Sequence, residues 1–219
     1  WENDLTAFRA YGPALQETGE RAFGYDIWTK YNTTEPVVEA RYEGELNPDM
    51  KAKITELGKT DPKAAQELYR SVSYHVDHGN GLDCYKVGPT LGGGTTALMA
   101  GDTIIYPYCY ATQEILDNGP LRFTVKLVYN PLVVKGDSTI IETRIITLDA
   151  GSYCNKTVVS YTNLKETMPL AVGIVLHEPD GAIVADAANG YMTYVDPTDN
   201  AGGDNGKIFV GAAFPTLVK

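Results

Sequence analysis

An alternation of apolar and polar residues between positions 121 and 129 constrains the fold of this chain most strongly. Every second side chain there is apolar, in the order Leu121, Phe123, Val125, Leu127 and Tyr129. Because the side chains of a β-strand point alternately to opposite faces, this pattern predicts a strand with one buried face. A second alternating run spans residues 139–148 and places Glu142 and Arg144 on the same face.

Further segments of the same kind predict a chain built mainly from strands. The candidates are residues 4–11, 23–28, 157–161, 171–176, 191–195 and 208–213. Turns rich in Gly, Asn and Asp separate them, and no helical pattern intervenes after residue 83. We therefore predict a mainly β fold, an antiparallel β-sandwich, in a single domain over residues 1–219. Residues 12–22 are expected to form a loop between the first two strands.

A helical insertion is expected over about residues 47–72. Asn47 and Asp61 each precede a proline, and a capping side chain followed by proline at the first helical position is a typical helix start. Apolar side chains recur at helical spacing after each start, and Gly58 separates the two runs. The pattern predicts two short helices inserted between strands.

Charge and apolar content exclude two classes of partner. The 219 residues include 18 Lys and Arg against 28 Asp and Glu, a formal net charge of −10. A nucleic-acid surface needs clustered cations, so we expect no nucleic-acid partner. No run approaches the roughly 18 apolar residues of a transmembrane helix, so we expect no membrane span. Cys84, Cys109 and Cys154 lack metal-binding spacing, and we expect buried free thiols, with one bridging pair as the alternative.

The densest group of chemically reactive side chains lies between residues 74 and 89. Its members are His75, Asp77, His78, Asp83 and Lys86. Histidine moves protons near neutral pH, and glycines within the segment let these side chains converge. Imidazole with carboxylate is also a transition-metal ligand set, but this spacing is no specific metal signature. We interpret the segment as a candidate active site; the alternative is a connecting loop whose Asp and His side chains hydrogen-bond locally.

Basic side chains within the strand segments are candidates for binding a carboxylate. They are Arg9, Lys30, Arg122 and Arg144. A guanidinium group binds a carboxylate through two parallel hydrogen bonds, which suits an acidic substrate. The alternative is an ordinary cross-strand ion pair, for instance with Glu142. We favour the binding role for Arg122, which follows a turn, and the ion pair for Arg144.

Three further features are assigned structural roles. The glycine run at 92–94 lacks the Gly-Lys-Ser/Thr ending of a phosphate loop, so no nucleotide site is expected. His177 is expected to be a surface histidine before a turn. The loop at 196–205 is rich in oxygen ligands but lacks EF-hand spacing, so a solvated turn is expected, with a divalent cation such as calcium as the alternative. No organic cofactor is expected.

Four ordered motifs resemble one bacterial family. They read W-E-N-D-x-x-A-F-R-x-Y-G-P at 1–13, G-Y-D-I-W-T-K at 24–30, Y-H-x-D-H-G-x-G-x-D-x-Y-K-V-G-P-T-L-G-x-G at 74–94 and N-G-P-L-R at 118–122. Over most of its length the chain resembles the family known as domain of unknown function 4861. The resemblance implies a β-supersandwich of the galactose-mutarotase type. It also implies an exported protein of polysaccharide-degrading bacteria, found beside enzymes for pectin-like, uronate-containing glycans.

The resemblance also implies where the protein acts and how far it extends. An exported member is expected in the periplasm or outside the cell, with its leader absent from this chain. Family members run longer, with further strands after the region that matches Gly211. The sandwich is therefore expected to be incomplete at its C-terminal end.

These observations lead to the hypothesis of a carbohydrate-active protein that uses His/Asp acid-base chemistry on uronate-containing oligo- or polysaccharides. The candidate catalytic residues are His75, His78, Asp77 and Asp83. The candidate substrate-binding residues are Arg9, Asp26, Trp28, Lys30, Tyr85, Lys86, Arg122 and Glu142. A lyase with Tyr74 or Tyr85 as the acid, a hydrolase with two carboxylates and an epimerase all remain open. The alternatives are a non-catalytic glycan-binding β-sandwich module and a structural accessory domain.

Overall fold

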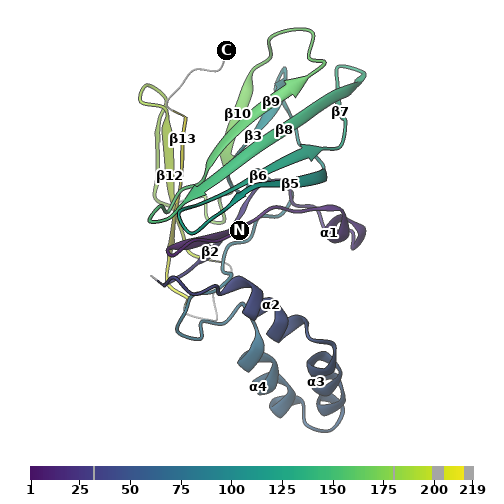
Figure 1. Cartoon of the computed structure of the whole chain (residues 1–219), viewed down its shortest axis with the longest axis vertical. Helices are drawn as coiled ribbons and strands as arrows, with labels where there is room; N and C mark the ends of the chain where they lie inside the picture. Colours follow the sequence, from purple (N-terminus) through teal and green to yellow (C-terminus); the bar gives the residue numbers. More distant parts are fainter. Residues whose placement is uncertain (32, 180, 199–204, 215–219) are drawn as a thin grey trace.

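The computed structural model describes residues 1–31, 33–179, 181–198 and 205–214. It confirms a mainly β fold of several antiparallel sheets, consistent with a β-sandwich. The sheets gather at one end of the molecule, and three helices project from the other (Figure 1). Among the described residues, no helix combines the length and the apolar character needed to cross a bilayer.

The largest sheet contains the two strongly alternating segments. Its strand order is β5–β6–β8–β7, and β9 also pairs with β8. The bounds are β5 Tyr110–Asn118, β6 Arg122–Tyr129, β7 Leu132–Val134, β8 Asp137–Asp149 and β9 Lys156–Thr162. The predicted strands at 121–129, 139–148 and 157–161 are confirmed as β6, β8 and β9. Val125 of β6 pairs with Ile146 of β8, and both side chains are buried.

A second sheet, β10–β3–β4, packs against the first. Its strands are β10 Leu170–Ile174, β3 Gly93–Ala100 and β4 Thr103–Ile105. A buried cluster joins Leu98 of β3 to Leu132 of β7 and Ile140 of β8. This contact forms the interior of the sandwich at that end. The predicted strand at 171–176 is confirmed as β10, and the glycine run leads into β3.

A third sheet, β11–β12–β13, confirms the predicted strands at 191–195 and 208–213. Its bounds are β11 Ile183–Asp186, β12 Tyr191–Asp196 and β13 Ile208–Ala213. Ile208 and Val210 of β13 pack on the buried side chains of Tyr85 and Val87. The sheet therefore covers the segment that follows the predicted histidine cluster.

The prediction of a surface position for His177 was wrong. Its side chain is 21% exposed, and Nδ1 lies 2.5 Å from the Oδ2 atom of the fully buried Asp196 in β12. The other ring nitrogen lies 2.7 Å from the backbone oxygen of Lys86. The histidine thus ties the third sheet to the 84–88 segment, and its partners are distant in sequence, so the local turn pattern carried no sign of them.

The two N-terminal strands form a small antiparallel sheet beside the large one (Figure 1). They are β1 Thr6–Arg9 and β2 Asp26–Thr29. Trp1 packs against the buried cluster that contains Tyr25, Val125 and Ile146. Residues 12–22 are not entirely a loop, because the short helix α1 Pro13–Glu17 begins at a proline within them.

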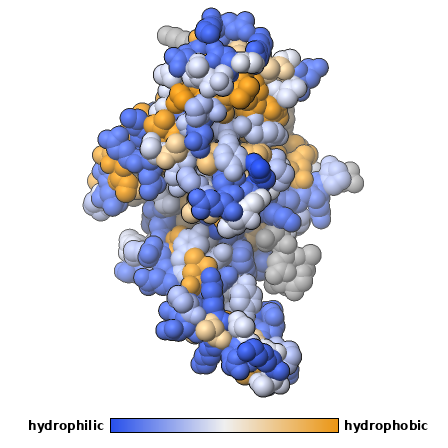
Figure 2. Space-filling model, turned by 90° about the vertical axis from the view of Figure 1, so that its right-hand side faces the viewer, coloured by the Kyte–Doolittle hydropathy of each residue, from blue (hydrophilic) through white to orange (hydrophobic). Residues whose placement is uncertain are grey.

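The helical projection contains the two predicted helices and a third that was not predicted. The helices are α2 Val38–Leu46, α3 Pro48–Thr60 and α4 Pro62–Val72. Asn47 and Asp61 cap α3 and α4 by accepting hydrogen bonds from backbone N–H groups, as predicted. Figure 2 shows that the outer surface of this projection is mostly hydrophilic, which fits helices with almost no fully buried side chains.

Helix α2 was missed because its cap comes from a distant part of the chain. Its own N-cap residue, Val37, makes no side-chain cap. Instead the carboxylate of Glu2 accepts hydrogen bonds from the N–H groups of Val37 and Val38 at 3.0–3.1 Å. A carboxylate stabilises a helix N-terminus because it accepts hydrogen bonds from the unpaired N–H groups there and opposes the positive end of the helix dipole. Because Glu2 is distant in sequence, no capping residue next to the helix signals where it begins.

Strands β3, β4, β5, β7 and β11 were also missed, and regular β-structure resumes at residue 93 rather than 83. Most residues of β5 are exposed. An edge strand exposed on both faces has no need of an alternating pattern. β4 and β7 are only three residues long, which is too short for a period to be recognised.

A buried ion pair lies on the inner face of β8. Arg144 Nε donates to Glu142 Oε1 at 2.5 Å, and neither side chain is exposed. The guanidinium also lies 4.6 Å from the ring centroid of Tyr129 and donates to the backbone oxygen of Thr96 in β3 at 3.2 Å. The ion pair favoured for Arg144 exists, but it joins two residues of one strand, whereas a cross-strand pair was predicted. It joins the two sheets of the sandwich and lies away from the predicted active site.

We predict that Arg144→Met lowers the free energy of unfolding by about 3–5 kcal/mol, because it leaves the Glu142 carboxylate buried without its cation. Urea denaturation measures this loss. The matched control is Lys165→Met, which removes the 2.7 Å ion pair of an 82% exposed lysine with Asp137 and should cost less than about 1 kcal/mol. The double variant Glu142→Leu/Arg144→Met should recover part of the stability lost in Arg144→Met, because no charge is then left buried. Equal losses of stability in Arg144→Met and Lys165→Met would contradict this prediction.

Candidate functional site

The pairing of β1 with β2 places an arginine directly opposite an aspartate. Arg9 and Asp26 are Cα partners in the register, and Ala7 faces Trp28 one step along the same face. The Arg9 Nη2 atom contacts the Asp26 carboxylate closely. Both residues were predicted to bind substrate, and in the structure they form an ion pair with each other.

A second carboxylate reaches the same guanidinium from the 74–89 segment. Asp83 forms an isolated antiparallel bridge with Trp28, and its Oδ2 atom lies 2.8 Å from Arg9 Nη2. Gly81 makes this approach possible: its φ is +96°, and a Cβ there would lie 2.0 Å from the backbone oxygen of Thr29. The loop is therefore held directly against β2, and Asp83 and Arg9 meet across 74 residues of sequence.

The burial of this charge cluster changes the protonation of Asp26. The carboxylate is fully buried, and desolvation together with the nearby Asp83 outweighs the effect of Arg9, so the pKa of Asp26 rises to about 8. Because Asp26 and Asp83 both contact Arg9 Nη2, the protonation of one carboxyl group depends on the charge of the other. Such separated proton affinities are a feature of acid-base sites.

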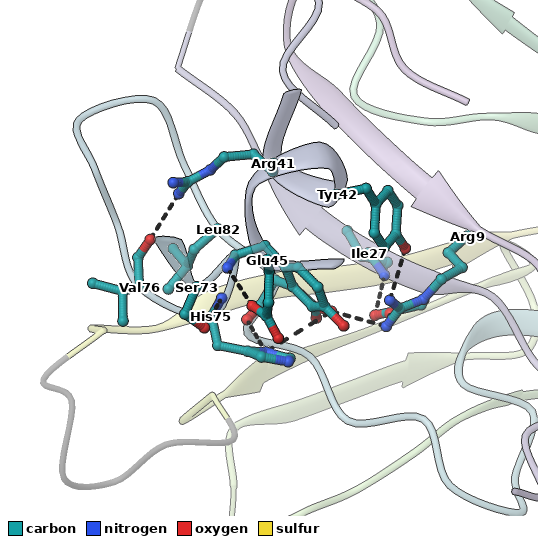
Figure 3. A network of polar contacts seen from close by, with 12 residues as sticks. Arg9, Ile27, Arg41, Tyr42, Glu45, Ser73, His75, Val76 and Leu82 are labelled. Carbon is teal, nitrogen blue, oxygen red and sulfur yellow. Dashed lines mark hydrogen bonds and ion pairs between the residues drawn. The ribbon is translucent and has the colours of Figure 1, made fainter. Parts of the chain in front are cut away.

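Helix α2, which the sequence analysis missed, positions the loop over this cluster (Figure 3). Tyr42 accepts a hydrogen bond from Arg9 Nη1 at 2.9 Å. Arg41 donates to the backbone oxygens of Val76 and Gly81 at 2.7 and 3.0 Å. Glu45 accepts from the backbone N–H of Tyr74 at 2.8 Å. Arg41, Tyr42 and Glu45 recur at helical spacing, the one local signal that could have revealed this helix.

Aromatic rings form a continuous wall beside the charges. Trp28 stacks on Tyr74 with ring centroids 5.1 Å apart, and Tyr42 lies 5.3 Å from Trp28 and 5.2 Å from Tyr74. The ring of His75 follows at 4.4 Å from Tyr74. We call these four residues the aromatic wall. Trp28 and His75 were predicted site residues; Tyr42 was not.

His75 is the histidine that the structure joins to the charge cluster. Its Nδ1 atom lies 3.1 Å from the backbone oxygen of Asp83 and 3.9 Å from the Asp83 carboxylate, and its side chain is 39% exposed. Because a carbonyl oxygen only accepts, Nδ1 carries the proton of this hydrogen bond. Nε2 of the neutral ring is then the basic nitrogen.

A pocket of about 250 Å³ is lined by Trp28 and Tyr42 of the aromatic wall, but not by Tyr74 or His75. Its walls come from the N-terminal segment with β1 and from β2, α2, β5 and β6. The lining residues are Trp1, Phe8, Arg9, Ala10, Trp28, Val38, Tyr42, Tyr110, Gln113, Ile115, Phe123, Val125 and Leu127. Most are apolar or aromatic, and Arg9 is the basic member. The sequence analysis did not identify this pocket, because its walls come from five separate segments.

Two of the candidate catalytic residues serve the loop itself. Asp77 accepts hydrogen bonds from the N–H groups of Gly79 and Gly81 at 2.8 and 3.2 Å, and from the Tyr31 hydroxyl at 2.5 Å. His78 contacts the backbone oxygen of Ser73 through Nε2 at 3.0 Å. Both side chains are exposed. For Asp77, the structure shows the local turn that was the alternative interpretation.

Three of the predicted binding residues lie at other junctions. Lys30 is almost fully buried and contacts Glu2 at 2.7 Å, which joins it to the cap of α2. Tyr85 is buried, and its hydroxyl donates to the backbone oxygen of Gly92 at 3.0 Å. Lys86 is exposed, and its backbone accepts from His177. None of the three lines the pocket.

The predicted convergence of Arg122 on the site does not occur. Arg122 pairs with Asp149 directly across the β6–β8 ladder, at 2.5 and 2.9 Å, in an exposed position. Glu142 is in the sandwich interior with Arg144. The preference for a binding role of Arg122 is thus replaced by a cross-strand ion pair, since its partner lies at the far end of the neighbouring strand.

The cysteines and the oxygen-rich loop at 196–205, predicted as a solvated turn, were also considered as metal ligands. Cys84 and Cys109 are buried, as predicted, and Cys154 is exposed. Within the described ranges, no group of three His, Cys, Asp or Glu side chains is arranged to hold a metal ion. Residues 199–204 of the oxygen-rich loop lie outside the described residues, so the calcium alternative is not addressed there.

We predict that the charge cluster makes stability depend on pH in a defined direction. Because the pKa of Asp26 is raised in the folded protein, the protonated carboxyl group stabilises the folded state relative to the unfolded chain. This stabilisation is complete below about pH 4, where the carboxyl group is protonated in both the folded and the unfolded protein. It is lost as the pH rises to about 8. The free energy of unfolding of the native protein should therefore fall over this range relative to Asp26→Asn, by up to about 1.4 kcal/mol per pH unit. Urea denaturation at a series of pH values measures this change. If the free energy of unfolding depends on pH in the same way in the native protein and in Asp26→Asn, the raised pKa is not that of Asp26.

Comparison with known proteins places the chain among relatives. The profile of the family described as "Domain of unknown function (DUF4861)" matches residues 1–219. "Uncharacterized protein P7" of Formosa agariphila is 27% identical over 201 residues, which cover 89% of this chain but only 44% of that relative. No solved structure matches the chain, so the galactose-mutarotase likeness stays a prediction. With the match extending over its whole length, the chain belongs to the DUF4861 family.

Proposed function

We propose that this chain is part of an exported, periplasmic or extracellular, carbohydrate-active protein that acts on uronate-containing glycans by acid-base chemistry. The observation that carries the proposal is the placement of His75. Its ring is half exposed, oriented through Nδ1 by Asp83 and adjacent to the aromatic wall. The family resemblance supports the glycan class, and the geometry supports the acid-base role.

The orientation of His75 matches the requirement for a general base. A backbone acceptor on Nδ1 fixes the ring and leaves Nε2 as the proton acceptor. The Asp83 carboxylate, 3.9 Å from Nδ1, stabilises the imidazolium that forms when the proton arrives. A base held in this way can remove the acidic proton next to a uronate carboxyl group.

Tyr74 is the acid that the geometry favours. Its ring lies 4.4 Å from His75. Burial raises the pKa of Tyr74 to about 12, so the phenol keeps its proton at neutral pH and can donate it. Tyr85 was the other candidate, but its hydroxyl is buried and bonded to Gly92.

These two groups support β-elimination more than hydrolysis. In elimination, His75 takes the proton from the carbon next to the carboxyl group, its electron pair forms a carbon–carbon double bond, and the glycosidic oxygen leaves with a proton from Tyr74. Hydrolysis needs two accessible carboxylates, whereas Asp26 and Asp83 are 0% and 2% exposed and share Arg9. Epimerisation would use the same acid and base without bond cleavage.

A non-catalytic glycan-binding module is the second candidate, and the pocket favours it. Aromatic side chains with few polar groups suffice to bind a sugar ring, and the aromatic wall and pocket supply them. In that case the histidine would contribute to binding and no product would form.

We predict that His75→Gln lowers the rate of uronate-glycan cleavage by at least about 100-fold, since general-base catalysis contributes that much or more. The measurement is the ultraviolet absorbance of unsaturated uronate products, with equal urea midpoints showing that the variant folds. His78→Gln is the matched comparison from the same loop, and it should lose less than His75→Gln.

The outcomes separate the candidates. A greater loss in His78→Gln would contradict the assignment of the base to His75. Binding of uronate oligosaccharides by the native protein without any product, over a panel of pectin-like substrates, would favour the glycan-binding module. Absence of both binding and turnover would contradict the proposal.

A further inference from the structure

The pocket beside the aromatic wall contains polar hydrogens without acceptors. Arg9 Nε, Trp1 Nε1 and Trp28 Nε1 are buried and have no hydrogen-bond partner among the described residues. All three residues line the pocket. Leaving a buried donor unpaired costs about 1–3 kcal/mol, so buried polar groups are usually paired. Three such groups around one cavity indicate that an acceptor belongs there.

The three unpaired groups have the same chemistry. An indole nitrogen and a guanidinium nitrogen donate and cannot accept. Asp26 and Asp83 contact Arg9 through Nη2 but are absent from the lining, so the unpaired Nε–H of the guanidinium is the charged donor presented to the pocket. The complementary group is rich in acceptors and negatively charged, and a carboxylate has both properties.

The remaining walls define what carries the carboxylate. Phe8, Tyr42, Tyr110 and Phe123 present aromatic surface, which packs against a compact group with an apolar face. The volume of about 250 Å³ is small, and it suits a single ring rather than a long chain. A hexuronate ring combines the carboxylate with an apolar face.

We propose that this pocket is a binding subsite for one carboxylate-bearing sugar ring, distinct from the His75 base. The recognition of a carboxylate follows from the unpaired donors alone; identifying the ring as a sugar rests on the proposed function. The subsite would hold one residue of the glycan against Trp28 and Tyr42, separate from the residue that reacts at His75. It would thereby select acidic over neutral glycans.

Calorimetric titration of the native chain with galacturonate, and in parallel with neutral galactose, tests the proposal. Galacturonate should bind, and galactose should bind on the order of tenfold more weakly or not at all. Both tryptophans of the chain line the pocket, so intrinsic fluorescence should change with the same affinity. Equal affinities for the two sugars, or no binding of galacturonate at millimolar concentration, would overturn it.

A conservative variant keeps the wall and removes one donor. Trp28→Phe retains an aromatic ring but lacks the N–H, and it should weaken galacturonate binding on the order of tenfold. The control Tyr153→Phe removes a hydroxyl from a side chain that is 70% exposed and outside the pocket, and it should leave binding unchanged.

The subsite and the catalytic proposal fail separately. His75→Gln should abolish turnover without changing galacturonate affinity, whereas Trp28→Phe should change that affinity. Galacturonate binding without turnover in the native protein would retain the subsite and remove the catalytic proposal. Unchanged affinity in Trp28→Phe would overturn the subsite even if the enzyme is active.

Discussion

The sharing of one guanidinium by two buried acids is the interaction on which the rest of the site depends. Arg9 comes from β1, Asp26 from β2 and Asp83 from the loop after the helices. Burying such charges is costly unless they are paired, so the cluster requires all three segments to be in place together. Once they are, Trp28 is fixed next to Asp83, and His75 is oriented by the backbone of the same aspartate.

Other polar clusters hold other junctions of the molecule, which explains why the predicted site residues do not all converge. Lys30 with Glu2 supports α2, Arg144 with Glu142 joins the two large sheets, and His177 with Asp196 attaches the third sheet. The pairs Lys30–Glu2 and His177–Asp196 join residues distant in sequence, and Arg144 reaches the backbone of Thr96 in another sheet. The proposed chemistry is placed at the cluster where the 39% exposed His75 lies beside Tyr74, Tyr42 and Trp28.

Parts of the fold that obey local rules were predictable from the sequence. Alternation identified β6 and β8, and the caps Asn47 and Asp61 identified α3 and α4. The histidine segment was correctly singled out as chemically dense, but its sequence did not distinguish His75, joined to Asp83, from His78, which contacts a local carbonyl. Helix α2 was missed because Glu2 caps it from afar, which left only the spacing of Arg41, Tyr42 and Glu45 as a local signal. The pocket was not predictable, because its walls come from separate segments.

An experimental structure of His75→Gln with a bound uronate oligosaccharide would test the central claim most directly. The account predicts one sugar ring against Tyr74, with the carbon next to its carboxyl group about 3–3.5 Å from the side chain at position 75. A second carboxylate would lie in the pocket near Trp28. An oligosaccharide bound on another surface, with Arg9, Asp83 and the aromatic wall untouched, would contradict it.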